Sequence, residues 1–200
     1  MASARPLRDT QQFFAERATT WDERFPDDGP AYAQAAAELD PPAGGTLLDL
    51  GCGTARALRP LRAQIGPAGT VIALDATWEM LRAAGEAGRQ QFGDLVAADA
   101  LSLPLRDRCL DAVFAAGILH HLPGPDHGLA ELARTTRPGA RMAVFHPIGR
   151  ATLAARHGGT TSDDDFLAAA NLERALRDHG WELASIDDRD ERYLAIAVRG

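Results

Sequence analysis

The chain has 200 residues, of which 46% are hydrophobic and 24% are charged, a balance typical of a globular domain that can bury a core. The formal net charge is −7; an acidic surface repels phosphates, so we expect no nucleic-acid partner. All 21 basic residues are arginines, which excludes a Schiff-base lysine and a phosphate-loop lysine.

The cysteines and the first residues give no sign of export. Cys52 and Cys109 lie far apart and outside any C-x-x-C pattern, so they predict neither a disulfide framework nor a zinc site. Residues 1–12 lack the apolar core of a secretory signal. The longest apolar stretch, residues 112–119, is too short to cross a membrane. We therefore expect a cytoplasmic protein that does not associate with membranes.

Short runs rich in Val, Ile and Leu predict seven strands, at residues 46–50, 70–74, 95–98, 111–116, 140–145, 181–186 and 193–198. Apolar residues at three-to-four spacing predict helices between the first five strands, at residues 55–65, 78–87 and 128–135. Strands that are apolar on both faces and alternate with helices predict a mostly parallel sheet covered on both sides. The short polar connection 187–190 predicts an antiparallel hairpin at the end. The expected fold is α/β, a single three-layer doubly wound domain with a seven-stranded sheet.

Two segments stand outside this alternation. Residues 10–25 carry a third of the aromatic side chains ahead of the first strand, namely Phe13, Phe14, Trp21 and Phe25. Residues 147–161 form a long connection, which predicts a functional or disordered loop. A helix is expected after it, with Ser162 as N-cap, acidic residues 163–165 in the first turn and Gly180 as the stop.

A glycine turn follows the first predicted strand. Gly51 and Gly53 permit a tight turn and a close approach of a ligand to the backbone. A dinucleotide fingerprint requires a third glycine where this chain has Arg56. Asp49, two residues before Gly51, suits a cationic ligand better than a pyrophosphate.

Three more residues fall at the ends of later strands. Asp75 lies 24 residues after Gly51, about the separation of a ribose-binding acid from its glycine turn. Asp99 and Gly117 end the next two strands. In open α/β sheets, ligands bind at the carboxyl ends of the strands, so we expect one cofactor site there.

These residues resemble the motifs of class I S-adenosylmethionine-dependent methyltransferases, in particular the small-molecule group called type 11. Residues 49–54 (Asp-Leu-Gly-Cys-Gly-Thr) are similar to the first motif, 74–81 to the second and 98–101 to the third; 116–122 resemble the end of strand four and 137–139 the turn before strand five. The resemblance is specific from about residue 46 to residue 145 and implies S-adenosylmethionine as cofactor. It assigns the methionine part, the ribose and the adenine to positions that here are Asp49, Gly51, Cys52, Gly53, Asp75, Ala76, Met80, Asp99, Ala100 and Gly117.

Residues 13–22 resemble the N-terminal segment that folds over the cofactor in this family. The resemblance implies that Arg17 meets the methionine carboxylate and that Trp21 shields the methyl group. An amphipathic helix docked on the domain would explain the same residues.

The resemblance also bears on the acceptor. Strand four ends in Gly-Ile-Leu-His and not in Asn-Pro-Pro or Asp-Pro-Pro, and no Pro-Cys pair is present; with the acidic charge, this favours a small-molecule acceptor. His120 and His146 are the candidate catalytic bases, although His-His-Leu is common in the family and a packing role for His120 is an alternative. Three histidines near one cleft could also bind a metal, but no carboxylate has matching spacing, so we predict none.

The sequence therefore predicts a small-molecule methyltransferase and makes no prediction of oligomeric state. We divide the domain into an N-terminal lid with helices (1–40), a cofactor-binding core (41–146), an acceptor-side loop (147–162) and a C-terminal helix with a β-hairpin (163–200). Two alternatives are a cofactor-binding partner module without catalysis and an NAD-dependent oxidoreductase, which the glycine turn alone would support.

Overall fold

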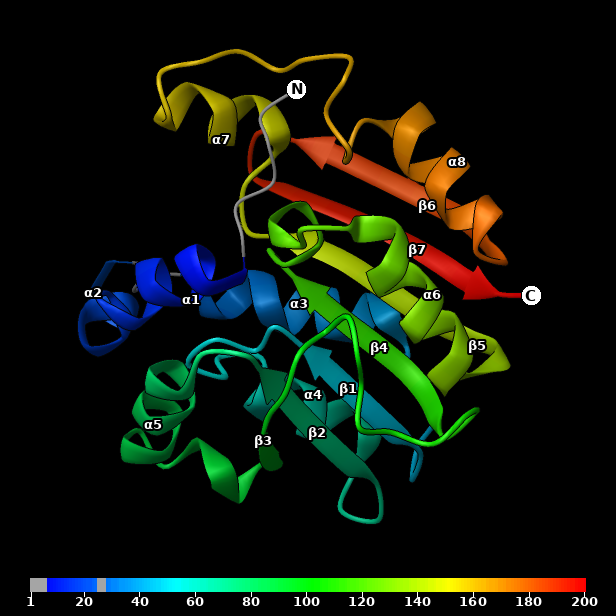
Figure 1. The fold of residues 1–200 in the computed structure, drawn as a ribbon. Helices are drawn as coiled ribbons and strands as arrows, with labels where there is room; N and C mark the ends of the chain where they lie inside the picture. Colours follow the sequence, from blue (N-terminus) through cyan, green and yellow to red (C-terminus); the bar gives the residue numbers. More distant parts are fainter. Residues whose placement is uncertain (1–6, 25–27) are drawn as a thin grey trace.

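The computed structural model describes residues 7–24 and 28–200, arranged around a seven-stranded sheet (Figure 1). The strands are β1 (Thr46–Leu50), β2 (Thr70–Asp75), β3 (Asp94–Ala97), β4 (Leu110–Ala116), β5 (Thr136–His146), β6 (Trp181–Arg189) and β7 (Arg192–Arg199). Their order is β3-β2-β1-β4-β5-β7-β6. Strands β1 to β5 pair in parallel, and β7 is antiparallel to both β5 and β6. The predicted fold class is confirmed.

Helices cover both faces of the sheet because its strands are apolar on both sides. Leu47 packs with α3 (Gly29–Leu39) and α4 (Leu58–Ile65), whereas Leu48 packs on the other face with α6 (Pro125–Thr135) and α8 (Ala169–Asp178). Neighbouring residues of a strand thus belong to different core clusters, as the period of two requires. Helix α5 (Trp78–Glu86) packs on β2 and β3.

Several predicted boundaries are wrong. Strand β5 begins at Thr136 and not at residue 140, so the residues expected to form the turn before it, 137–139, belong to the strand, and α6 begins at Pro125 and not at residue 128. The helix expected from residue 55 begins at Leu58, because Ala55 adopts a φ of +61° inside a longer turn. The hairpin strands continue through 187–189, which leaves only residues 190 and 191 as the turn. The helix expected at Ser162 begins at Ala169. Ser162 instead closes a separate turn, in which the amide of Asp165 donates to its carbonyl oxygen at 3.1 Å.

The connection expected to be a loop contains a helix, α7 (Arg150–Arg156). The backbone amide and the guanidinium of Arg150 both donate to the carboxylate of Asp188, each at 2.9 Å. Gly149 precedes this helix, and a Cβ built on it would lie 1.9 Å from the carbonyl oxygen of Arg189. Helix α7 is therefore attached to the tip of the β6–β7 hairpin.

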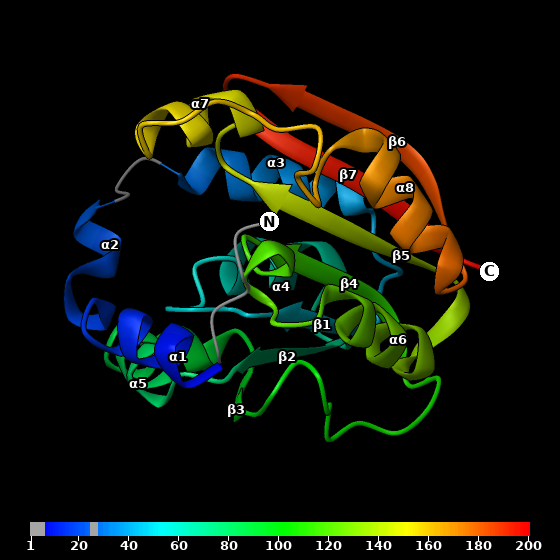
Figure 2. The same cartoon turned by 45° about the horizontal axis from the view of Figure 1, so that its top comes forward.

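The N-terminal segment forms α1 (Leu7–Ala15), a 3₁₀ turn (Ala18–Thr20) and α2 (Trp21–Arg24). Phe25, one of the aromatic residues noted in the sequence, lies outside the described residues. Figures 1 and 2 both place α1 and α7 at the end of the sheet toward which the arrowheads of β4 and β5 point. Among the described residues, no helix combines the length and apolar character needed to cross a bilayer.

Candidate functional site

The two glycines of the turn after β1 differ in what surrounds them. Both adopt a positive φ, +65° at Gly51 and +54° at Gly53, which glycine tolerates best. A Cβ on Gly51 would lie 2.7 Å from the side chain of Ile118, so this position needs glycine for packing. A Cβ on Gly53 would have no atom of the described chain within 4 Å. The backbone at Gly53 therefore borders open space that a ligand can enter.

Two carboxylates stand beside this space. Asp49 is 1% exposed, and its Oδ2 has no hydrogen-bond partner among the described residues. Burial and the neighbouring Asp75 raise the pKa of Asp49 to about 8. Asp75 accepts bonds from the amides of Gly53 at 2.8 Å and Thr77 at 2.7 Å, yet burial still raises its pKa. Since a nearby cation would favour the ionised form of both acids, the pair suits a cationic ligand.

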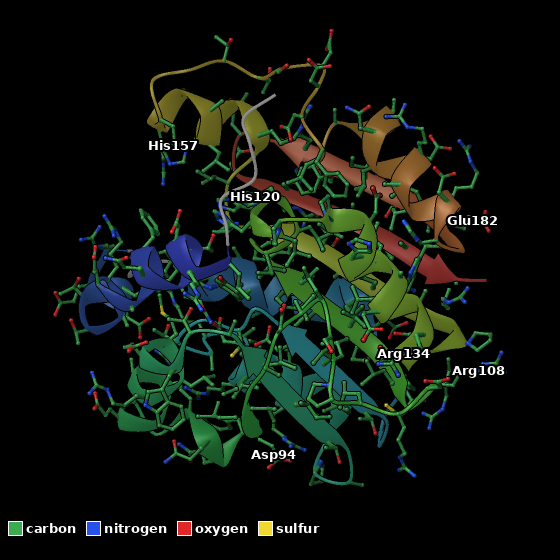
Figure 3. All side chains as sticks on the ribbon, viewed as in Figure 1. Asp94, Arg108, His120, Arg134, His157 and Glu182 are labelled. Atoms are coloured by element: carbon green, nitrogen blue, oxygen red, sulfur yellow. The ribbon has the colours of Figure 1, made fainter. Side chains whose placement is uncertain are left out.

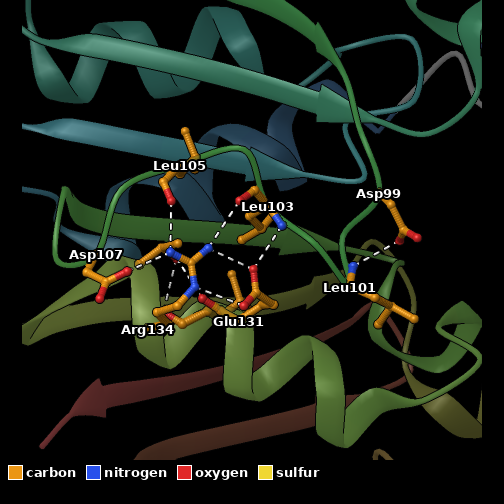
Figure 4. Close-up of polar contacts among 9 residues, drawn as sticks. Asp99, Leu101, Leu103, Leu105, Asp107, Glu131 and Arg134 are labelled. Atoms are coloured by element: carbon orange, nitrogen blue, oxygen red, sulfur yellow. Dashed lines mark hydrogen bonds and ion pairs between the residues drawn. The ribbon is translucent and has the colours of Figure 1, made fainter.

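Asp99 follows β3 at the same edge of the sheet. Its Oδ1 accepts a bond from the amide of Leu101 at 2.9 Å. The segment after it is held by α6 (Figure 4): Glu131 accepts from the amide of Leu103 at 2.9 Å, and Arg134 donates to the carbonyl oxygens of Leu103 and Leu105 at 3.1 and 2.9 Å. Two side chains of α6 thus fix the segment that follows Asp99.

The histidines lie at the ends of β4 and β5. Gly117 has a φ of +66°, and a Cβ on it would lie 3.7 Å from Cδ2 of His146. Burial lowers the pKa of His146. Desolvation of the ring by its neighbours and the nearby imidazoles of His121, His146 and His157 lower the pKa of His120, although the residue as a whole is exposed. These rings are therefore uncharged at neutral pH.

The chain is similar to known proteins in both sequence and structure. The family described as "Methyltransferase domain" matches residues 48–144, which include the glycine turn and the three acids. The DhpI–SAH complex structure has a TM-score of 0.72 to this chain at 26% identity and covers 96% of both chains. The chain belongs to the class I, Rossmann-like methyltransferases. The predicted family and its cofactor, S-adenosylmethionine, are confirmed.

Two curated relatives show how far the likeness extends. Malonyl-[acyl-carrier protein] O-methyltransferase of Methylococcus capsulatus is 34% identical over 160 residues, 76% of this chain and 56% of its own length. The ubiquinone/menaquinone biosynthesis C-methyltransferase UbiE of Hahella chejuensis is 34% identical over 111 residues, 52% of this chain and 43% of its own length. The chain thus spans about half the length of these relatives.

The residues of this methyltransferase domain fit the cofactor. A sulfonium and an ammonium group are cationic, and Asp49 is a buried acid that such a group would ionise, with an Oδ2 that has no hydrogen-bond partner among the described residues. Met80 and Ala100 are 1% and 7% exposed, and Cys52 is half-buried with a pKa raised by burial, so its thiol is uncharged. The roles assigned to these residues and to Ala76 stay predictions.

Residues 7–24, which we call the lid, are fastened to the methyltransferase domain beside the glycine turn. The hydroxyl of Thr54 donates to Asp22 at 2.6 Å, and Arg89 pairs with Asp22 while donating to the carbonyl oxygen of Thr54. These bonds lower the pKa of Asp22 even though burial acts in the opposite direction. Gln11 donates to the carbonyl oxygen of Ala76 at 2.8 Å. The lid therefore touches both the first and the second cofactor motif.

The aromatic residues of the lid form its contact with the strand ends. The ring of Phe14 meets those of Trp21 and His121 edge-on, with centroids 5.5 and 5.3 Å apart. Arg17 donates to the carbonyl oxygen of Phe13 at 2.8 Å and lies 3.8 Å above its ring. The predicted contacts of Arg17 and Trp21 with the cofactor stay predictions.

A pocket of about 190 Å³ opens next to the histidines, lined by His120, Arg150, Leu153, Ala154, His157, Asp165 and Leu167. Figure 3 shows His120 below α7, and His157 directly follows the last residue of that helix. A larger hollow of about 610 Å³ lies at the opposite edge of the sheet, where Arg137 pairs with Asp111, and it contains none of the predicted site residues. Within residues 7–24 and 28–200, no group of three His, Cys, Asp or Glu side chains is arranged to bind a metal.

Sequence reasoning missed the residues that hold these parts together. Asp22 stands in the quoted lid motif, so its position was visible but its partner was not. The long-range partners of Arg89 and Arg134 lie 27 to 67 residues away and leave no local signal, although Arg134 also pairs with Glu131 three residues before it. His157 directly follows the last residue of α7, a helix that the sequence did not predict.

Proposed function

We propose that this protein transfers a methyl group from S-adenosylmethionine to a small-molecule acceptor at the ends of β4 and β5. The observation that carries the proposal is the buried carboxyl group of Asp49, two residues before the glycine turn, whose Oδ2 has no hydrogen-bond partner among the described residues. The relatives support methyl transfer, and their names specify an O-methyltransferase in one case and a C-methyltransferase in the other. The acceptor must therefore be inferred from this chain's own residues.

The candidate cofactor-binding residues would contact different parts of S-adenosylmethionine. Asp49 would face the cationic methionine part, while Asp75 and Asp99 would accept hydrogen bonds from the ribose and adenine. When bound, S-adenosylmethionine supplies a methyl group on a sulfonium; the acceptor's electron pair forms the new bond while the electrons of the carbon–sulfur bond go to sulfur. Holding the reacting groups in line in a site closed to water contributes about 7–11 kcal/mol to such a step.

We propose that His146 is the base that removes the proton of the acceptor. Its Nδ1 lies 3.0 Å from the carbonyl oxygen and 3.2 Å from the amide nitrogen of Ile148. One ring nitrogen cannot donate to the first and accept from the second at once; the shorter contact favours a proton on Nδ1. Nε2 then carries the lone pair, and the adjacent Cδ2 is the ring atom nearest to Gly117. The neutral ring is a base that takes one proton from a protic acceptor.

Calorimetric titration with S-adenosylmethionine and S-adenosylhomocysteine tests the proposal. We expect both to bind. With S-adenosylmethionine labelled at its methyl group, we expect the wild-type protein to transfer the label to at least one member of a panel of small-molecule acceptors. Folded protein that binds neither compound would refute the proposal. Binding without methyl loss would favour a non-catalytic partner module, and tighter binding of NAD would favour an oxidoreductase.

A further inference from the structure

The peptide bond between Thr54 and Ala55 is a strained part of the glycine turn. Ala55 adopts a φ of +61°, a left-handed conformation that residues other than glycine rarely adopt. The amide of Ala55 donates to the carbonyl oxygen of Cys52 at 2.7 Å. The carbonyl oxygen of Thr54, at the other end of the same peptide, accepts from Nη1 of Arg89 at 2.5 Å. Arg89 therefore fixes the orientation of a peptide that comes directly after Gly53, where the backbone borders open space.

Arg89 lies outside every cofactor motif of the sequence. It begins a 3₁₀ turn (Arg89–Gln91) just beyond α5, 35 residues after Thr54. Helix α5 starts at Trp78, within the second motif (74–81). Arg89 thus joins the end of the element that carries part of the second motif to the turn of the first.

The same guanidinium holds the lid. Its Nη2 donates to Oδ2 of Asp22 at 2.5 Å, and Oδ1 of Asp22 accepts from the hydroxyl of Thr54 at 2.6 Å. Asp22, Thr54 and Arg89 form a closed ring of three hydrogen bonds, each with an ionised partner, and such bonds are stronger than neutral ones. A second cation, Arg56, acts on Asp22 through its charge but is itself paired with Asp28 at 3.3 Å. Arg89 is the member of the ring that comes from neither the lid nor the glycine turn, so it can bridge them.

We propose that Arg89 is a positioning residue for cofactor binding. It holds the Thr54–Ala55 peptide in the conformation that leaves the backbone of Gly53 open to the cofactor, and through Asp22 it holds the lid against that turn. This rests on the cofactor site of the proposed function. If Arg89 were only an anchor of the lid, loss of Asp22 would have the same effect as loss of Arg89. Because Arg89 also holds the turn, its loss must have the larger effect.

Calorimetric titration with S-adenosylhomocysteine separates the two actions. Arg89→Gln breaks the bonds to both the turn and the lid and should weaken binding about tenfold. Asp22→Ala leaves the bond from Arg89 to the carbonyl oxygen of Thr54 in place and should weaken binding about threefold, the value of one hydrogen bond at a partly exposed site. Arg82→Gln, which removes an exposed charge from α5, should not weaken it. Equal losses in Arg89→Gln and Asp22→Ala, or no loss in Arg89→Gln, would overturn the proposal.

Hydrogen exchange of the ligand-free variants tests the same point without the cofactor, since exchange rates report local opening segment by segment. We expect Arg89→Gln to speed exchange in residues 7–24 and in residues 51–57, and Asp22→Ala to speed it in residues 7–24 alone. Arg89→Lys keeps a cation beside Asp22 and should restore slow exchange in residues 7–24.

Three results of this measurement would overturn the proposal. They are an unchanged rate at residues 51–57 in Arg89→Gln, faster exchange throughout the chain in that variant, and no recovery with lysine. Wild-type protein that does not bind S-adenosylhomocysteine would instead count against the proposed function, and the exchange pattern would still test what Arg89 holds.

Discussion

Asp49→Asn tests whether the carboxyl group of this residue is protonated in the ligand-free protein and becomes ionised when a cation binds. In the folded chain its pKa is raised from 3.8 to about 8. Between these values the native state keeps a proton that the unfolded state has released, so stability falls as pH rises through this window. Each pH unit corresponds to about 1.4 kcal/mol, which makes the penalty at pH 7 on the order of 4 kcal/mol. Asparagine has the same shape without the ionisation.

Urea unfolding of the ligand-free protein measures this penalty. We expect the asparagine variant to match the wild type near pH 4 and to become progressively more stable than it as pH rises to 8. Asp94→Asn, a change at an exposed strand residue, controls for loss of a surface charge and should show no such trend.

Cofactor binding should reverse the protonation of Asp49. A cation beside the carboxylate favours the ionised form, so binding at pH 7 should release up to about one proton, because a group with a pKa near 8 is mostly protonated there. Calorimetry in buffers of different ionisation enthalpy measures this release, which the asparagine variant should lose together with about 10- to 100-fold in affinity for S-adenosylmethionine. Wild-type binding that does not depend on the buffer, or an unchanged affinity in the variant, would refute the reasoning.

Three other substitutions test the supports of the site. Arg89→Gln removes the lid's partner and should speed S-adenosylhomocysteine release about tenfold in stopped-flow, whereas Arg82→Gln, in an exposed pair on α5, should not. Arg134→Ala should lower the free energy of unfolding by about 1–2 kcal/mol, since its guanidinium is partly exposed, and urea titration measures it. Gly51→Ala should abolish binding of S-adenosylhomocysteine in calorimetry. Gly139→Ala should retain it, because Gly139 also has a positive φ but a Cβ built there has no atom of the described chain within 4 Å. Equal losses in both variants would assign the effect to backbone strain alone.

The sheet could be predicted because its signal is local. Leu47, Leu48 and Leu50 are all 0% exposed, and a run with no polar face is typical of a strand covered on both sides. The boundary at Ser162 failed for the opposite reason. A serine followed by three acids has the local chemistry of a helix start, but Asp165 pairs with Arg150 instead. Asp165 also accepts a hydrogen bond from the amide of Leu167, and the helix begins only at Ala169.

The cofactor side could be predicted because topology places it. Parallel strands bring their carboxyl ends to one edge, so Asp49, Asp75 and Asp99 lie near one another once the strand order is known. The contacts that complete this side join residues far apart in sequence, such as Asp22 and Arg89. Neither of these two residues has a spacing or a neighbour that indicates the other, since they are 67 residues apart in the sequence.

The sequence marks residues 147–162 as a loop on the acceptor side but does not predict the helix within them, and the reason lies in how α7 is held. This helix of seven residues has no buried side chain, so no apolar periodicity marks it in the sequence. It is fixed by polar bonds from Arg150 to Asp165 and Asp188 and by the close approach of Gly149 to the hairpin. Substitutions along α7 can therefore alter the pocket without disturbing a hydrophobic core, whereas a substitution in the glycine turn alters cofactor binding for any acceptor. In the proposed function, acceptor choice and cofactor binding would thus be carried by separate parts of the chain.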